Sequence, residues 1–271
     1  MSVYTAPHPR SPRRPAHALV AHQVRYDGLA FLRNRQSRFF TLALPVLFLV
    51  ILCAIFGNGT VRVAGGEIKE STYYVPGLVA YGVISASFMN LVISVTAQRE
   101  SGILKRRRST PVPAWVLIAG RSVVAVGTGA AIAVILMLIG AVVYGATVPG
   151  RTIPAICVSI AVGAITFCAL GFALVTAIKS ADSAQPVIQL VTLPLLFISG
   201  VFVPSDVMPR WLLDVSNFFP VRHLQQALLK GFNPHTVGAG FAWHDLLILA
   251  IWGAVGLAIA IWRFSWKPRA R

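Results

Sequence analysis

The chain has 271 residues, of which 56% are hydrophobic and only 12% are charged. Soluble domains carry about 25% charged residues, so the composition excludes an ordinary soluble protein and predicts a polytopic membrane protein. A net charge of +16 is compatible with nucleic-acid binding, but basic residues also flank membrane spans on the cytoplasmic side. Because apolar segments dominate the chain, we expect no nucleic acid among its partners.

Residues 1–18 are rich in proline and arginine, which predicts a disordered cytoplasmic tail and no signal peptide. Residues 19–38 then show a helical period, in which Val24 and Phe31 fall in an apolar sector and Asp27 falls mostly opposite. A basic amphipathic helix before the first span is typical of the lipid interface. We therefore predict an interface helix there, and a solvated helix is the alternative.

Apolar segments of about 20 residues, the length that crosses a bilayer as a helix, recur six times along the chain. Prolines and glycines punctuate them, and polar loops such as residues 58–72 connect them. The pattern predicts an all-α polytopic membrane protein with one six-span domain over residues 39–271. The expected spans are residues 39–57, 73–97, 114–144, 153–178, 186–203 and 246–264.

Residues 204–243 are too apolar for a solvated loop, yet four prolines exclude one long helix. Short re-entrant helices that dip into the outer leaflet and pack against protein would explain both properties. A pair of amphipathic helices on the membrane surface is the alternative.

The loop of residues 98–113 holds five cations, and each would cost about 2.5–3.5 kcal/mol in hydrocarbon. The loop must therefore lie in water, and its charge marks the cytoplasmic side. With the N-terminus on that side, six spans leave 18 lysines and arginines inside and six outside. The positive-inside rule thus predicts a multi-pass protein of the cytoplasmic membrane with both termini in the cytoplasm.

The chain offers little chemistry of its own. All eight carboxylates lie outside the apolar segments or at their rims, which disfavours a carrier coupled to protons or sodium. The three cysteines lie within apolar segments without metal-ligand spacing, and no phosphate-binding loop of the Gly-x-x-x-x-Gly-Lys-Ser/Thr type occurs. We expect no catalytic residue, metal or cofactor on this chain, so energy for uphill transport would enter from another protein.

Two stretches of the chain have a distinctive sequence. The first follows the second span and reads Arg-Glu-Ser-Gly-Ile-Leu-Lys-Arg over residues 99–106. The second reads Leu-Pro-Leu-Leu-Phe-Ile-Ser-Gly-Val-Phe-Val-Pro over residues 193–204 and continues to Phe-Pro-Val-Arg-His at residues 219–223. Both stretches resemble the permease subunits of type-2 ATP-binding-cassette (ABC) exporters. The span count and the interface helix agree, so the likeness covers almost the whole chain. Within this family the chain most resembles the daunorubicin-resistance-like drug-efflux permeases.

The resemblance implies a half-transporter. Two permeases would pair, with a homodimer expected, and each would dock a separate ATPase subunit that binds Mg-ATP. In the family, the interface helix and the loop after span 2, here called the coupling loop, contact the ATPase. Charged side chains there could pair with opposite charges on the partner, although part of the arginine run could instead meet anionic lipid. The candidate coupling residues are Arg99, Glu100, Gly102, Leu104, Lys105 and Arg106.

The implied mechanism is alternating access along a path lined by spans 2 and 5. We expect export of an amphiphilic drug or lipid. Export of a polysaccharide or glycolipid is the alternative, and an ATP-independent channel or carrier is a rival of another class. Ordinary helix packing or lipid contact is the simpler role for each path candidate. The candidates are Phe88, Met89, Asn90, Phe197 and Phe202.

Overall fold

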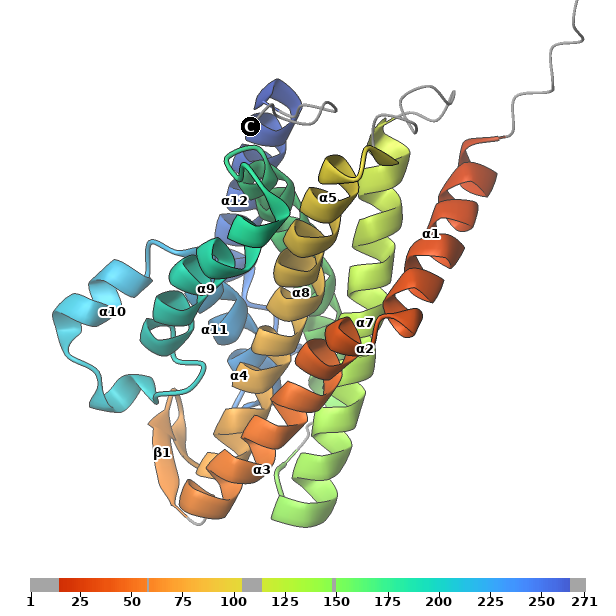
Figure 1. Ribbon diagram of the computed structural model, residues 1–271. Helices are drawn as coiled ribbons and strands as arrows, with labels where there is room; N and C mark the ends of the chain where they lie inside the picture. The colour runs from red at the N-terminus through yellow and green to blue at the C-terminus, as the bar shows by residue number, and fades with distance from the viewer. Residues whose placement is uncertain (1–14, 58, 104–113, 148–149, 264–271) are drawn as a thin grey trace, which may run out of the picture.

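A computed structural model describes residues 15–57, 59–103, 114–147 and 150–263 (Figure 1). Most of the expected tail and most of the coupling loop lie outside these residues. The described part is a bundle of long helices with one small β-hairpin. Its elements are α1 (Ala16–Arg33), α2 (Arg35–Arg38), η1 (Phe39–Ala43), α3 (Leu44–Phe56), β1 (Thr60–Val63), β2 (Gly66–Lys69), α4 (Glu70–Ile84), η2 (Ser85–Met89), α5 (Asn90–Glu100), α7 (Ala114–Tyr144), η3 (Gly150–Thr152), α8 (Ile153–Val175), α9 (Ala181–Ile198), η4 (Ser205–Val207), α10 (Arg210–Ser216), α11 (Pro220–Phe232) and α12 (Trp243–Arg263).

Six helices of the described chain are long and apolar enough to cross a membrane, which confirms the predicted number. The fifth begins five residues earlier than expected, because Ser180 caps it: its hydroxyl accepts a hydrogen bond from the Ser183 amide at 3.3 Å. A side-chain acceptor at this position satisfies an amide that the helix itself leaves unpaired. The six spans are Phe39–Phe56, Glu70–Glu100, Trp115–Tyr144, Gly150–Val175, Ala181–Ile198 and Trp243–Arg263.

Helix α4 forms the centre of the bundle. Every residue from Ser71 to Ile84 is buried, and the helix packs against α3, α7, α8 and α11. A helix that is apolar on all sides is stable only when other elements surround it. The phenolic hydroxyl of Tyr73 donates a hydrogen bond to the carbonyl of Gly200 at 2.8 Å, which ties the start of α4 to the turn after α9.

The two ends of the bundle differ. Figure 1 places the start of α1 and the ends of α5, α8 and α12 at one end, and the β-hairpin at the other. The expected polar loop of residues 58–72 contains this hairpin, in which Thr60 lies opposite Lys69. Gly65 makes the turn with a φ of +93°, a backbone conformation that glycine adopts without strain.

The region between α9 and α12 contains two helices, α10 and α11, which differ in burial. Helix α11 has eleven of its thirteen residues buried and packs against α4, α8 and α12. Helix α10 lies on the surface, with Trp211 and Val215 exposed. Helix α11 is therefore packed within the bundle and α10 lies on its surface, while the re-entrant and the surface-lying interpretations both stay predictions.

Candidate functional site

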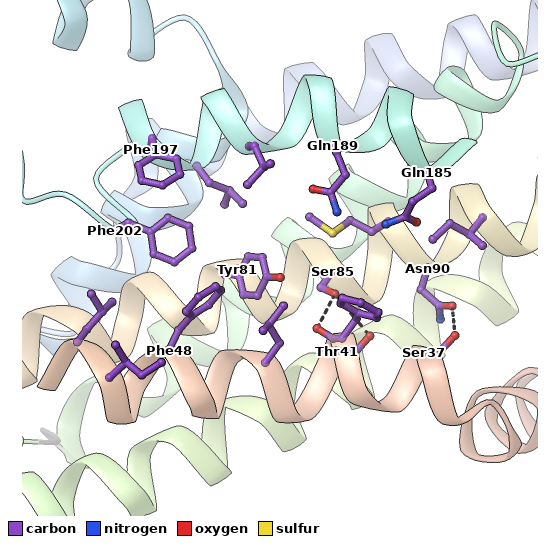
Figure 2. Close-up of a pocket in the computed structure, with 18 of the residues that line it drawn as sticks. Ser37, Thr41, Phe48, Tyr81, Ser85, Asn90, Gln185, Gln189, Phe197 and Phe202 are labelled. Atoms are coloured by element: carbon purple, nitrogen blue, oxygen red, sulfur yellow. Dashed lines mark hydrogen bonds between the residues drawn. The ribbon is translucent and has the colours of Figure 1, made fainter. Parts of the chain in front are cut away.

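A cavity of about 630 Å³ lies between three parts of the bundle (Figure 2). One wall is the segment from the end of α1 through η1 to α3, another runs from α4 through η2 to α5, and the third is α9 with the turn that follows it. Its volume falls within the range of about 300–1,000 Å³ that is usual for small-molecule sites. The cavity therefore has the size of a site for a small amphiphile.

One end of the cavity is aromatic. The centre of the Phe202 ring lies 5.2 Å from the ring centre of Phe48, 5.3 Å from that of Phe197 and 6.0 Å from that of Tyr81. The Phe48 ring meets both Phe202 and Tyr81 nearly edge to face, an arrangement that aromatic quadrupoles favour. Figure 2 shows these rings gathered at one end of the cavity, which gives that end an apolar lining.

The other end of the cavity is polar without being charged. It is lined by Asn34, Ser37, Asn90, Gln185 and Gln189. The hydroxyl of Ser37 donates a hydrogen bond to Asn90 Oδ1 at 3.0 Å. Among the described lining residues, none is an aspartate, glutamate, lysine, arginine or histidine, so the polar groups at this end are amides and hydroxyls.

Two π-helical turns, η1 and η2, face each other beside the cavity. A π-turn shifts the backbone hydrogen-bond pattern and is frequent at functional sites. The hydroxyl of Ser85 in η2 donates to the Phe40 carbonyl in η1 at 3.3 Å and lies 3.5 Å from the Thr41 hydroxyl. These contacts join the first two spans where both line the cavity.

The structure brings four of the five path candidates together at this cavity: Met89, Asn90, Phe197 and Phe202. The fifth, Phe88, is 8% exposed and packs against Phe167 with the ring centres 6.4 Å apart. Phe88 therefore belongs to the core rather than to the cavity. Gln185 and Gln189 were not predicted as site residues, because the expected fifth span began at residue 186 and left Gln185 outside it, whereas α9 begins at Ala181 and holds both.

Arg99, the first coupling candidate, is buried, with 3% of its surface exposed. Its guanidinium donates hydrogen bonds to the carbonyls of Val175 at 2.9 Å and of Ile178 at 2.6 Å. The last carbonyls of a helix lack partners within the helix and carry partial negative charge. Arg99 thus fastens the end of α5 to the end of α8, and its guanidinium is not presented to a partner's surface.

Glu100 completes this connection on the next helix. Its Oε2 accepts a hydrogen bond from the amide of Ala181 at 2.7 Å, and Ala181 is the first residue of α9. A carboxylate is favourable at a helix N-terminus, where amides are unpaired and the helix dipole is positive. Two adjacent residues therefore hold both sides of the turn between α8 and α9. We call Arg99 and Glu100 together the clamp.

Gly102 ends α5 with a φ of +73°, and its amide donates to the Arg99 carbonyl at 3.2 Å. Glycine is the residue that most readily takes this left-handed conformation at a helix end. The glycine of the coupling motif thus has a backbone role: it turns the chain away from α5. The remaining coupling candidates, Leu104, Lys105 and Arg106, lie outside the described residues.

Helix α1 is fixed to α7 by a buried ion pair. Arg121 Nε lies 3.5 Å from Asp27 Oδ2, and the same oxygen accepts a hydrogen bond from Gln23 at 2.7 Å. Arg121 also donates to the Ser94 hydroxyl at 2.6 Å. Asp27, which lies mostly opposite the apolar sector of the predicted interface helix, thus has a buried partner in Arg121, while Leu29 and other apolar side chains of α1 are exposed.

A second polar cluster joins α11 to α12. His223 Nδ1 lies 2.7 Å from Asp245 Oδ1, and His223 Nε2 lies 2.8 Å from the Asn217 carbonyl. Burial lowers the pKa of His223, but the hydrogen bonds to Asp245 and Asn217 more than offset this and leave the pKa above its ordinary value. With His244, these side chains form a group close enough to hold a metal ion. Both ring nitrogens of His223 already have protein partners.

Comparison with known proteins gives a consistent result. The family described as ABC-2 type transporter matches residues 22–233. The protein named as transport permease YvfS of Bacillus subtilis is 22% identical over 80% of this chain and 85% of its own length. The inner membrane transport permease YadH of Escherichia coli is 24% identical over 71% of this chain and 75% of its own length.

Proposed function

Because the chain belongs to the ABC-2 type transporter family, we propose that it is the permease subunit of an ATP-driven exporter that moves an amphiphilic drug or lipid across the cytoplasmic membrane. The observation that carries this proposal is the cavity between the first, second and fifth spans, aromatic at one end and polar at the other. Such a lining matches a molecule with an apolar body and a polar head.

The energy for transport would come from a separate ATPase subunit that binds Mg-ATP. The coupling loop, continuous with α5, would dock this subunit. The clamp supports a route from that loop to the cavity, because Arg99 and Glu100 connect the end of α5 to the start of α9. Both helices line the cavity, so a displacement of the loop would move two of its walls together.

The proposed orientation places the coupling loop and both termini in the cytoplasm, in agreement with the charge distribution along the sequence. Two copies of the chain would form the transporter, with alternating access between them. A polysaccharide exporter is less well supported, because the four rings gather at one end of the cavity. Their faces are then not arranged as a continuous lining for sugar rings.

Co-expression with the ATPase encoded nearest to this gene tests the proposal. The complex is purified by a tag on the permease, and cells that express both subunits are assayed for lower accumulation of a fluorescent amphiphile. We expect the ATPase to copurify, and Glu100→Ala to reduce efflux while the permease still reaches the membrane. Absence of any copurifying ATPase, together with unchanged efflux by Glu100→Ala, would contradict the proposal.

A further inference from the structure

The polar end of the cavity is built from side chains of three separate segments. Asn34 lies between α1 and α2, Asn90 begins α5, and Gln185 and Gln189 lie one turn apart on α9. Figure 2 shows Asn90 and the two glutamines on opposite walls at the end of the cavity away from Phe197 and Phe202. Amide groups on facing walls can donate to and accept from the same bound molecule.

Much of this hydrogen-bonding capacity is not used within the protein. Asn90 uses its oxygen to accept from Ser37, which leaves its two N–H donors. Within the described part of the chain, no hydrogen bond is recorded for the side chains of Gln185 or Gln189, and neither side chain is buried. The polar end therefore presents both donors and acceptors to whatever occupies the cavity.

The uncharged lining of the cavity favours amphiphiles with an uncharged head over those with a charged head. A charged head at the amide-lined end of the cavity loses hydration without gaining an opposite charge. An uncharged head with hydroxyl or amide groups exchanges its water hydrogen bonds for those of the glutamines and asparagines. No described lining residue carries a formal charge that could reverse this preference.

We infer that the cavity binds neutral amphiphiles: molecules with an uncharged, hydrogen-bonding head at the Gln185–Gln189 end and an apolar body among the phenylalanines. This inference rests on the proposed function and specifies its substrate class. It assigns Gln185 and Gln189 as the residues that determine head-group specificity, and Phe197 and Phe202 as contacts for the apolar body.

The test uses the purified permease alone in lipid nanodiscs, so that no ATPase is needed. Three probes share one photoactivatable oleyl tail and differ only in the head: glycerol, trimethylammonium and phosphate. Labelling of peptides from α3 and α9 is quantified by mass spectrometry. We expect the glycerol probe to label these peptides at least about tenfold more than either charged probe. A tenfold ratio corresponds to a difference of about 1.4 kcal/mol in binding free energy.

Substitutions within the cavity sharpen the test. Gln189→Glu keeps the side-chain shape and adds a negative charge, so it should reverse the preference toward the trimethylammonium probe. Gln185→Glu is a second variant with the same expectation. Phe197→Ala is the matched control: it removes a tail contact and should lower labelling by all three probes by a similar factor.

Equal labelling by the three probes, or an unchanged preference in both glutamate variants, would overturn the inference. So would the absence of labelling, which is the result expected if a second copy of the chain covers the cavity. The proposed function fails separately: loss of ATPase copurification with the glycerol preference intact would contradict coupling while supporting the substrate class.

Discussion

Arg99 is buried at the end of α5, where its guanidinium donates hydrogen bonds to the carbonyls of Val175 and Ile178. The coupling motif identifies Arg99, Glu100 and Gly102 by position in the chain. The sequence alone gives no sign that Arg99 is buried, because the carbonyls that accept its hydrogen bonds are 76 and 79 residues away. A cation in a basic loop is ordinarily solvated, and only the arrangement of α5 beside the end of α8 gives this one a structural partner.

Substitution of Arg99 tests the clamp. Arg99→Ala removes a charged donor from the carbonyls at the end of α8, and hydrogen bonds to charged groups are worth about 1.5–3 kcal/mol each. We expect a loss of about 2–3 kcal/mol in the free energy of unfolding, measured by denaturant titration in detergent micelles. The control is Arg62→Ala, because Arg62 is exposed on the hairpin. A loss for Arg99→Ala no larger than for Arg62→Ala would show that the clamp contributes nothing to stability.

Gly102 gives a prediction about backbone conformation. No atom lies within 4 Å of the position that a Cβ would occupy, but its φ is +73°. Gly102→Ala should therefore destabilise the protein by about 1–2 kcal/mol through the left-handed backbone alone. Gly127 also has no atom within 4 Å of its Cβ position but lies inside α7, where alanine is favoured by about 0.5–1 kcal/mol. The thermal midpoints should shift in opposite directions, and shifts of the same sign would refute this explanation.

Among the elements, hydropathy was sufficient to predict the six spans. It was insufficient to predict the π-turns within two of them or the hairpin and the buried helix α11 between them. The spans follow from the length of apolar segments, a property local to the sequence. The π-turns η1 and η2 depend on how two spans meet at Ser85 and Phe40, and the burial of α11 depends on α4, α8 and α12. The hairpin was missed because its strands have only four residues each.

The His223–Asp245 contact between α11 and α12 predicts a dependence of stability on pH. Since the folded state raises the pKa of His223 above its ordinary value of 6.5, the protonated form stabilises the fold. This contribution is fully present below about pH 6.5 and is lost as the pH rises through the folded-state pKa. The charged groups that act on the His223 ring are Asp245 and Arg222. His244 lies beside Asp245.

Thermal unfolding of the wild type should occur at a lower temperature at about pH 8.5 than at about pH 6. His223→Gln should reduce this difference, because glutamine does not titrate in that range. His235→Gln is the control, since His235 lies at the hairpin end and contacts the Glu67 carbonyl. An unchanged pH difference in His223→Gln would show that another group is responsible.

At the scale of the whole molecule, the described chain forms one bundle with functionally distinct parts. The start of α1, the end of α5 and the end of α12 share one end (Figure 1). The hairpin and the His223 cluster belong to segments that the positive-inside rule predicts to lie outside. The cavity lies between these regions, and the clamp connects two of its walls to the coupling loop. Docking of an ATPase at the α5 end is the central claim of this account.

Site-specific photocrosslinking tests that claim most directly. Benzoylphenylalanine is introduced at Ser101 or at Ile103, both exposed after the end of α5, and at Val237, which is 93% exposed near the hairpin. Membranes containing the permease and the ATPase encoded beside it are irradiated. We expect a permease–ATPase crosslink from residues 101 and 103 and none from residue 237. A crosslink from residue 237 alone, or from none of the three positions in a complex that copurifies, would contradict it.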